Sequence, residues 1–166
     1  MIMTENRYVA IVEDDEDDRD FITMALNNSS PQMMIQTFRN GTEFLRFVQT
    51  AQQLPGLIIT DIRMPLVSGF DVIAEIKSAS KTKDIAIVVL STSGSEADKT
   101  RARELGAADY FIKPYSVEEY SAITGNIVER LNAGTLKFSH EFRQIKAFIK
   151  RSFTLCFPWR PLPVKV

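Results

Sequence analysis

The stretch GLIITDIRMPLVSGFD, residues 56–71, carries the strongest structural signal in the chain. Four apolar or β-branched residues, 57–60, run directly into a single acid, Asp61, after which Pro65 and Gly69 break the pattern. A short apolar run bounded by turn-forming residues is typical of a strand buried in a parallel sheet. Burying a carboxylate directly after such a strand costs free energy, so Asp61 is a candidate for a functional role.

Working outward from this stretch, four more apolar runs alternate with segments of helical periodicity. The expected strands are 8–12, 33–38, 57–60, 86–90 and 109–112. The expected helices begin near Asp17 and after Gly41, and then span 70–76, 96–105 and 117–131. This alternation predicts parallel βαβ units, and hence an α/β fold: a (βα)5 doubly wound parallel sheet in three layers. The second run alternates apolar and polar residues, which indicates an edge strand.

Composition narrows the class of protein. With 166 residues, 45% of them hydrophobic and 25% charged, the chain suits one compact domain with an appendage. A formal net charge of -1 gives no reason to expect nucleic acid or an anionic membrane as the partner. Cys156 is the single cysteine, which excludes an internal disulfide, and one histidine leaves no Cys/His set for zinc. The longest aliphatic run, 85–90, is far shorter than the roughly 20 residues of a membrane span, so a cytoplasmic protein is expected.

Charged and hydroxyl-bearing residues directly follow four of the five expected strands. In open α/β sheets, ligands bind beyond the carboxyl ends of the strands, so these side chains are expected along one rim. They are Glu13, Asp14 and Asp15 after the first strand, Asp61 after the third, Ser91 and Thr92 after the fourth, and Lys113 and Pro114 after the fifth.

This set of side chains suits phosphoryl chemistry with Mg²⁺. Converging carboxylates repel one another unless a cation lies among them. Mg²⁺ prefers oxygen ligands, takes one or two carboxylates and keeps waters that a phosphoryl group can displace. Asp61 is the candidate nucleophile, because a carboxylate can attack phosphorus to form an aspartyl phosphate. Lys113 and Ser91 can then bind the phosphate oxygens.

Four segments match one known family in order and in spacing. They are IVEDD at 11–15, DIRMPLVSG at 61–69, VVLSTS at 88–93 and DYFIKPY at 109–115. On these segments the chain resembles the receiver domain of two-component response regulators over about residues 6–131. The resemblance implies the flavodoxin-like strand order 2-1-3-4-5 that chemotaxis receivers show. The opening VEDDEDDRD is also similar, more weakly, to single-domain regulators that serve phytochrome-type sensor kinases.

The resemblance implies a role for each residue of the acidic cluster. Asp61 is expected to be the phosphoacceptor. Asp14 is expected to bind Mg²⁺ directly, and Glu13 more often through water. Arg63 would contribute its backbone carbonyl to the metal, while its side chain faces the crevice and tunes entry or hydrolysis. Asp15 is given no primary role.

Around the phosphoryl group, the resemblance implies a second set of roles. Ser91 would donate a hydrogen bond to it and Lys113 would pair with it. Pro114 would follow a cis peptide bond that fixes where Lys113 points. Tyr110 would be the switch aromatic, turning inward when Ser91 moves. Thr92 is bulkier than the small residue common in the family, which would slow the access of water.

The implied function is that of a single-domain response regulator, a phosphoacceptor that catalyses only its own phosphorylation and dephosphorylation. A sensor histidine kinase or a histidine phosphotransfer protein would supply the phosphoryl group. The face formed by the fourth helix, fifth strand and fifth helix would then signal to a protein partner. Residues 135–166 are too few for a DNA-binding domain with its own core, so direct contact with nucleic acid is not expected, whereas a homodimer remains open.

Several alternatives remain open at this point. A Mg²⁺-dependent phosphohydrolase with an aspartyl nucleophile usually has an acid two residues later, where this chain has Arg63. A receiver-like module that takes no phosphoryl group is the other rival. The acids Asp17, Asp18 and Asp20 are interpreted as a solvated helix start, favoured by the helix dipole, and not as part of the site.

The C-terminal segment differs in composition from the rest of the chain. Residues 132–136 are expected to be a linker. Residues 137–153 place apolar side chains at helical spacing among basic ones, which predicts a basic amphipathic helix. The segment 157–166 holds three prolines and predicts an extended arm. Packing on its own domain or a sister subunit is favoured, an outside protein partner comes next, and membrane contact is the least favoured.

Overall fold

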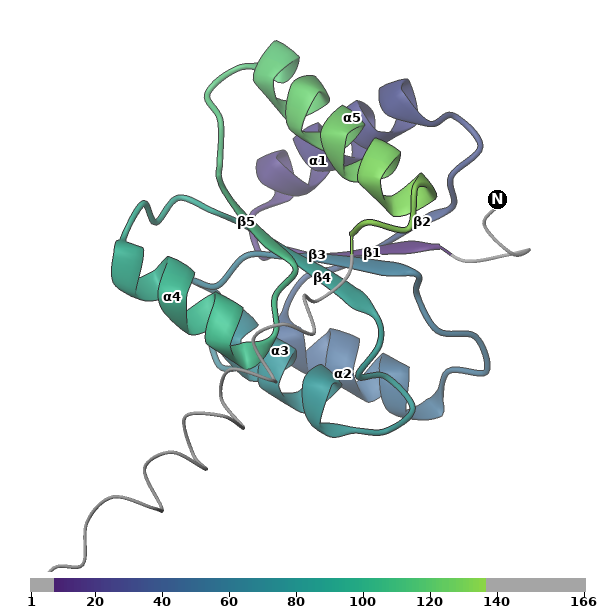
Figure 1. Ribbon diagram of the computed structural model, residues 1–166, viewed down its shortest axis with the longest axis vertical. Coiled ribbons are helices and arrows are strands. Elements are labelled where there is room, and N and C mark those ends of the chain that lie inside the picture. The colour runs from purple at the N-terminus through teal and green to yellow at the C-terminus, as the bar shows by residue number, and fades with distance from the viewer. Residues whose placement is uncertain (1–7, 137–166) are drawn as a thin grey trace, which may run out of the picture.

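The computed structural model describes residues 8–136, in which a five-stranded parallel sheet lies between two layers of helices (Figure 1). The strands are β1 (Val9–Val12), β2 (Ile35–Phe38), β3 (Leu57–Thr60), β4 (Ala86–Ser91) and β5 (Asp109–Ile112). The helices are α1 (Glu16–Ser29), α2 (Gly41–Thr50), α3 (Gly69–Ser78), α4 (Glu96–Leu105) and α5 (Val117–Asn132). The predicted (βα)5 fold is therefore confirmed. The helix and arm expected in 137–166 lie outside the described residues.

The strand order is β2-β1-β3-β4-β5, and every neighbouring pair is parallel. This confirms the order that the resemblance implied. All residues of β1, β3 and β4 are buried, as expected for strands covered by helices on both faces. β2 lies at an edge and is only partly buried, which its alternating sequence indicated.

Side chains along each strand alternate between two separate cores, because successive residues of a strand point to opposite faces of the sheet. Val9 and Ile11 pack with α1 and α5, whereas Ala10 and Val12 pack with α2, α3 and α4. In Figure 1, α1 and α5 cover one face of the sheet and the other three helices cover the opposite face. The two cores hold the sheet rigid and leave the carboxyl ends of its strands free to form a site.

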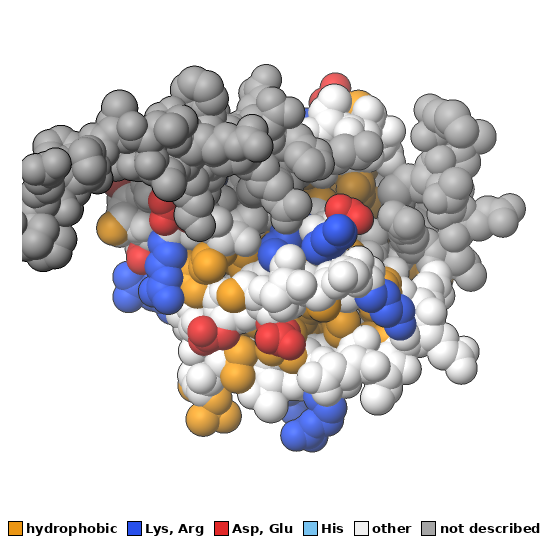
Figure 2. Space-filling view, turned by 60° about the horizontal axis from the view of Figure 1, so that its bottom comes forward, with side chains coloured by type: hydrophobic (Ala, Val, Ile, Leu, Met, Phe, Trp, Pro, Cys, Tyr) orange, Lys and Arg blue, Asp and Glu red, His pale blue; other side chains and the backbone are white. Residues whose placement is uncertain are grey.

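α4 has the fewest buried residues among the helices described. Ala102 is the one buried side chain in α4, and acidic and basic residues make up most of the helix. Figure 2 shows basic and acidic side chains close together on the left side of the molecule, which is where α4 lies in Figure 1. Since apolar burial supplies most of the stability of a packed helix, α4 is the helix that can shift at the lowest cost.

The turn between β3 and α3 depends on a glycine and on a helix cap. A Cβ atom at Gly69 would lie 1.9 Å from the backbone oxygen of Asp61, so only glycine permits this approach. The next helix is capped by Ser68, whose hydroxyl accepts from the backbone N–H of Asp71 while the Asp71 carboxylate accepts from the backbone N–H of Ser68. The start of α3 is thereby held against the residue that follows β3.

The folded unit continues past the end of α5. The backbone N–H groups of Thr135 and Leu136 donate to the carbonyl of Arg130, so the chain turns back after the helix. Leu136 is buried in the core between α1, α5 and the sheet. Leu136 therefore anchors the end of the segment 132–136 to the domain, whereas residues 132–135 are exposed. No helix within residues 8–136 is both long and apolar enough to cross a membrane.

Candidate functional site

The residues that follow β1, β3 and β5 continue the hydrogen-bond ladder of the sheet by one step. The backbone N–H of Glu13 donates to β2 (3.0 Å), that of Asp61 to β1 (3.1 Å) and that of Lys113 to β4 (2.8 Å). The sheet thus fixes the backbone of all three residues along one rim. Their side chains meet there, as the strand-end pattern predicted.

Asp61 is buried, with 5% of its surface exposed, and both carboxylate oxygens are held. Oδ1 accepts from the backbone N–H groups of Ile62 (2.5 Å) and Arg63 (3.1 Å). Oδ2 accepts from Nζ of Lys113 at 3.0 Å. Backbone donors cannot rotate away as side chains can, so the orientation of this carboxylate is fixed before any reaction.

The acidic cluster has the composition of a divalent-cation site. Glu13, Asp14 and Asp61 place carboxylate oxygens within 4.8 Å of one another. Glu13 is buried, and its Oε2 lies 2.8 Å from Nζ of Lys113. Burial raises the pKa of Glu13 to about 7, although nearby Lys113 opposes the rise. Three converging carboxylates, two of them buried, fit a hard cation such as Mg²⁺.

Lys113 lies at the centre of these acids. Its Nζ lies 2.6 Å from Oδ2 of Asp18, 2.8 Å from Oε2 of Glu13 and 3.0 Å from Oδ2 of Asp61. Burial alone would lower the pKa of Lys113, but hydrogen bonds and charge interactions with these carboxylates raise it above its ordinary value. The lysine therefore stays charged and compensates the buried acids.

Asp18 belongs to this site, so its interpretation as a solvated acid at a helix start is wrong. It lies one turn before Ile22 and two turns before Leu26, both fully buried, and so shares the inner face of α1. Extending the apolar stripe of α1 back by one turn would have identified it. Asp17 and Asp20 are exposed, as expected.

Arg19 is a second residue that the sequence did not mark. Its Nη1 donates to the backbone carbonyls of Glu13 and Asp14, both at 2.9 Å. This contact ties the loop after β1 to the first turn of α1. No spacing rule predicts such a side chain-to-backbone contact.

The Arg63 side chain extends over the rim to the start of α4 and is mostly exposed. Its Nη2 lies 3.3 Å from Oγ of Ser93 and 3.4 Å from Oδ2 of Asp98, and these two side chains also bond to each other. The loop after β3 is thereby connected to the loop after β4 and to α4.

The residues predicted to act as a switch, Ser91, Thr92 and Tyr110, occupy different environments. Ser91 is fully buried, and its Oγ accepts from the backbone N–H of Ser93 at 3.4 Å. No hydrogen bond joins Ser91 to Asp61 in the described part of the chain. Tyr110 is half-buried and its hydroxyl donates to the carbonyl of Ser93 at 2.8 Å. Thr92 is exposed.

The cis peptide bond expected before Pro114 is absent, because residues 8–136 contain no cis peptide bond. The expectation is wrong, and the Lys113–Pro114 bond has the trans form that most X–Pro bonds prefer by about 0.5–1 kcal/mol. The position of Lys113 is set instead by its backbone bond to β4 and by the three carboxylates around Nζ.

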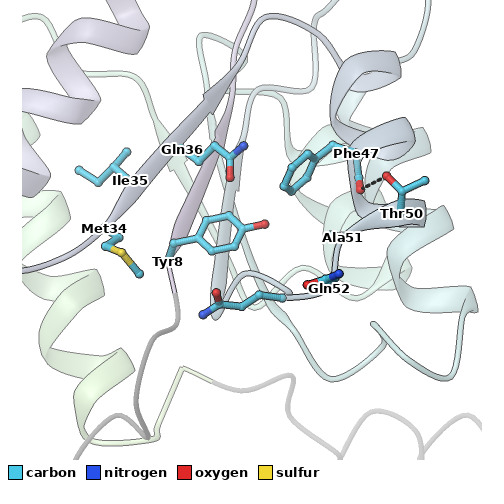
Figure 3. A pocket seen from close by; sticks show the side chains of 9 residues that line it. Tyr8, Met34, Ile35, Gln36, Phe47, Thr50, Ala51 and Gln52 are labelled. Atoms are coloured by element: carbon cyan, nitrogen blue, oxygen red, sulfur yellow. Dashed lines mark hydrogen bonds between the residues drawn. The ribbon is translucent and has the colours of Figure 1, made fainter.

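A separate pocket of about 570 Å³ lies by the start of β2 and the end of α2 (Figure 3). Its lining includes Tyr8, Met34, Phe47 and Gln52. Burial raises the pKa of Tyr8, whose hydroxyl lacks a hydrogen-bond partner among the described residues. Since β strands in this sheet are parallel, the pocket lies at the end opposite to the acidic cluster and takes no part in that site.

Comparisons with known proteins agree with this geometry. The model of the response regulator receiver domain matches residues 9–124. The probable transcriptional regulator ycf27 of Guillardia theta is 34% identical over 124 residues, which make up 75% of this chain and 46% of that protein. The chain thus spans about half the length of this relative.

Two solved structures share the fold across most of the described chain. The phosphorylated cyanobacterial phytochrome response regulator RcpA matches with a TM-score of 0.70 and 32% identity, covering 76% of this chain and 94% of that one. The Mn²⁺-bound response regulator Rcp1 matches with a TM-score of 0.65 and 29% identity, covering 74% of this chain and 91% of that one. The chain therefore belongs to the response regulator receiver family of two-component systems.

Proposed function

We propose that this receiver domain accepts a phosphoryl group on Asp61, with Mg²⁺ as cofactor, and passes the signal to a protein partner. The observation that carries the proposal is the setting of the Asp61 carboxylate. It is buried at a strand end, held by two backbone N–H groups and by Lys113, and lies beside two further carboxylates. Such an acid is poised to act as a nucleophile toward phosphorus.

The transfer would need no proton from the nucleophile. A carboxylate oxygen of Asp61 attacks the phosphorus of a phosphohistidine, a new O–P bond forms, and the N–P bond to the donor imidazole breaks. The electron pair of that bond stays on the imidazole nitrogen. Lys113, already within hydrogen-bond distance of the acceptor, can turn its ammonium protons to the phosphoryl oxygens.

Mg²⁺ would be held by the carboxylates of Glu13, Asp14 and Asp61 and by the backbone carbonyl of Arg63. When bound, the cation neutralises charge on the phosphoryl oxygens. The convergence of these three carboxylates, two of them buried, supports this assignment. The Mn²⁺-bound form of the similar response regulator Rcp1 is consistent with a divalent ion in such a site.

Ser91, Thr92 and Tyr110 would respond to the phosphoryl group. The new negative charge would draw the Ser91 hydroxyl toward Asp61, and Ser91 Oγ now bonds the same residue, Ser93, whose carbonyl binds Tyr110. Movement in this loop would therefore reach both α4 and β5. The small apolar contact of α4 supports the face of α4, β5 and α5 as the part that a partner reads.

The proposed partners are a sensor histidine kinase or a histidine phosphotransfer protein upstream and a protein target downstream, with a homodimer as one form of that target. Direct contact with nucleic acid is not part of the proposal. The domain would act as a signalling phosphoacceptor in the cytoplasm, and its catalysis would extend only to its own phosphorylation and dephosphorylation.

The test is the intact mass of the full chain after incubation with acetyl phosphate and Mg²⁺. We expect one added phosphoryl group, lost when a chelator removes the metal and absent in Asp61→Asn. A folded, Mg²⁺-binding wild type that gains no mass would instead make the domain a fixed interaction module.

A further inference from the structure

The carboxylate closest to Lys113 is neither that of Asp61, the proposed acceptor, nor one of the cluster of Glu13, Asp14 and Asp61. Lys113 Nζ lies 2.6 Å from Asp18 Oδ2, against 2.8 Å for Glu13 and 3.0 Å for Asp61. An ammonium carries three protons and a flexible four-carbon stem, so its direction is set by what surrounds it. Asp18 is the shortest of its three contacts.

Asp18 is itself held in place by α5. Its second oxygen, Oδ1, accepts from the hydroxyl of Tyr120 at 3.0 Å. Tyr120 is 3% exposed, and its ring stacks on Phe21 of α1 with ring centroids 5.8 Å apart. Burial and the Asp18 carboxylate raise the pKa of Tyr120, so the phenol keeps the proton that it donates. One carboxylate thus bridges the Tyr120 hydroxyl and the Lys113 ammonium.

We infer that Asp18 is a positioning residue for phosphoryl transfer, which together with Tyr120 holds the ammonium of Lys113 where it reaches Asp61. The inference rests on the proposed function and deepens it. A continuous chain of contacts runs from Tyr120 through Asp18 and Lys113 to Asp61. The packing of α1 against α5 thereby sets where the ammonium of Lys113 lies against the Asp61 carboxylate.

A charge effect and a positioning effect can be separated with the side chains that the molecule offers. Asp18→Asn removes the charge and keeps the shape. Tyr120→Phe keeps every charge and the stacked ring, and removes only the hydroxyl that fixes Asp18. Asp17→Asn is the matched control, because Asp17 is an exposed acid in the same turn without a hydrogen bond or ion pair to another described residue.

The experiment measures the rate of phosphorylation of the full chain by acetyl phosphate at saturating Mg²⁺. We expect Asp18→Asn and Tyr120→Phe to slow the reaction by about tenfold, since small displacements of a catalytic group cost rate steeply. We expect Asp17→Asn to keep the wild-type rate, and Tyr120→Phe to keep the wild-type affinity for Mg²⁺.

A second readout follows the lysine directly. The ¹H–¹⁵Nζ signal of an ammonium is visible by NMR when hydrogen bonds hold it, and Lys113→Arg assigns it. We expect this signal in the wild type and in Asp17→Asn, and its loss or broadening in the other two variants.

Wild-type rates and an unchanged signal in both variants would overturn the inference, and so would a slowed Asp18→Asn beside a normal Tyr120→Phe, which would indicate charge alone. If Asp18→Asn fails to fold, the phosphorylation rate and the NMR signal of Tyr120→Phe decide whether the inference holds. If the wild type takes no phosphoryl group, the proposed function fails, and the NMR signal still decides whether Asp18 and Tyr120 hold Lys113.

Discussion

Lys113 carries the positive charge that offsets the carboxylates of the site. Three carboxylates lie within 3.0 Å of its Nζ, and 5% of its side chain is exposed. Water can therefore screen these charges only weakly. The metal-free stability of the domain depends on this one ammonium.

The first prediction follows from that balance. Lys113→Met, which keeps most of the length of the side chain and removes the charge, should lower the free energy of unfolding by about 3 kcal/mol, because it leaves buried acids without their cation. Mg²⁺ should restore part of the loss. Urea denaturation in chelator and in Mg²⁺ measures both.

The control is Lys99→Met, which removes the pair of Lys99 with exposed Glu96. A pair of that kind contributes about 0–1 kcal/mol. Equal effects of the two substitutions would contradict a special role of Lys113.

The second prediction concerns Glu13, whose pKa burial raises to about 7. Below that pH the carboxyl is neutral and attracts a cation poorly; above it the carboxylate forms. The apparent affinity for Mg²⁺ should therefore rise about tenfold between about pH 6 and pH 8, with release of a proton on binding. Isothermal titration calorimetry in buffers of different ionisation enthalpy measures both quantities.

Glu13→Gln cannot titrate, so its weaker affinity should stay level over the same range. A wild-type affinity independent of pH would show that Glu13 is ionised throughout and would contradict the prediction.

Among single residues, the sequence predicted those that follow strands and missed those placed by packing. Glu13, Asp61 and Lys113 could be predicted because the ladder of a parallel sheet brings strand ends together. Asp18 was missed because its place in an acidic helix start suggested solvent, although its spacing from Ile22 and Leu26 pointed inward. The peptide bond before Pro114 could not be derived from residues at all, and the implied cis form was wrong.

Among the helices and strands, the turn from β3 into α3 brings Asp61 and the start of a helix together. Gly69 lies against the backbone of Asp61 so closely that any Cβ would overlap it. The helix also begins with a reciprocal cap between Ser68 and Asp71. The close approach of Gly69 positions the helix start against Asp61, whereas the cap stabilises the helix itself. Substitutions can therefore separate the two effects.

The third prediction uses this separation. Gly69→Ala should push the start of α3 off Asp61, lower the free energy of unfolding by about 2 kcal/mol and slow phosphorylation strongly. Ser68→Ala should cost about 1 kcal/mol for the lost cap and leave phosphorylation near the wild-type rate. Unfolding curves and acetyl phosphate kinetics test the pair, and similar kinetics for both variants would count against the close approach.

Most elements were predictable because each carries its own periodicity. β3, α4 and β5 begin and end where the sequence placed them, since turn residues bound them closely. β2 is shorter than its apolar run suggested, beginning at Ile35, because an edge strand pairs on one side only. The links between elements, such as Arg63 with Asp98, depend on side-chain reach and carried no sequence signal.

At the scale of the whole molecule, the core between the sheet, α1 and α5 is closed by Leu136, which lies beyond the last helix. Composition changes near residues 132–136, and this change suggested a linker. A single buried leucine after the last helix belongs to no periodic pattern, so the sequence does not indicate its burial. The extent of the packed unit therefore needed the structure.

The fourth prediction tests that closure in the full chain. Leu136→Ala should lower the free energy of unfolding by about 2–3 kcal/mol through a cavity in the α1–α5 core. Thr135→Ala, at an exposed neighbour, removes only a hydroxyl that bonds the carbonyl of Arg130 at 3.2 Å, and should change it by less than about 1 kcal/mol. Equal stability of the two variants would mean that Leu136 adds nothing to the core.

We expect the phosphoryl group on Asp61, and borohydride reduction of the phosphorylated protein locates it. Reduction converts an aspartyl phosphate to homoserine, and trypsin then releases the peptide 47–63, in which Asp61 is the one acidic side chain. The account predicts homoserine at position 61 in that peptide, dependent on Mg²⁺ and on acetyl phosphate. Homoserine at another aspartate, with peptide 47–63 unchanged, would contradict it.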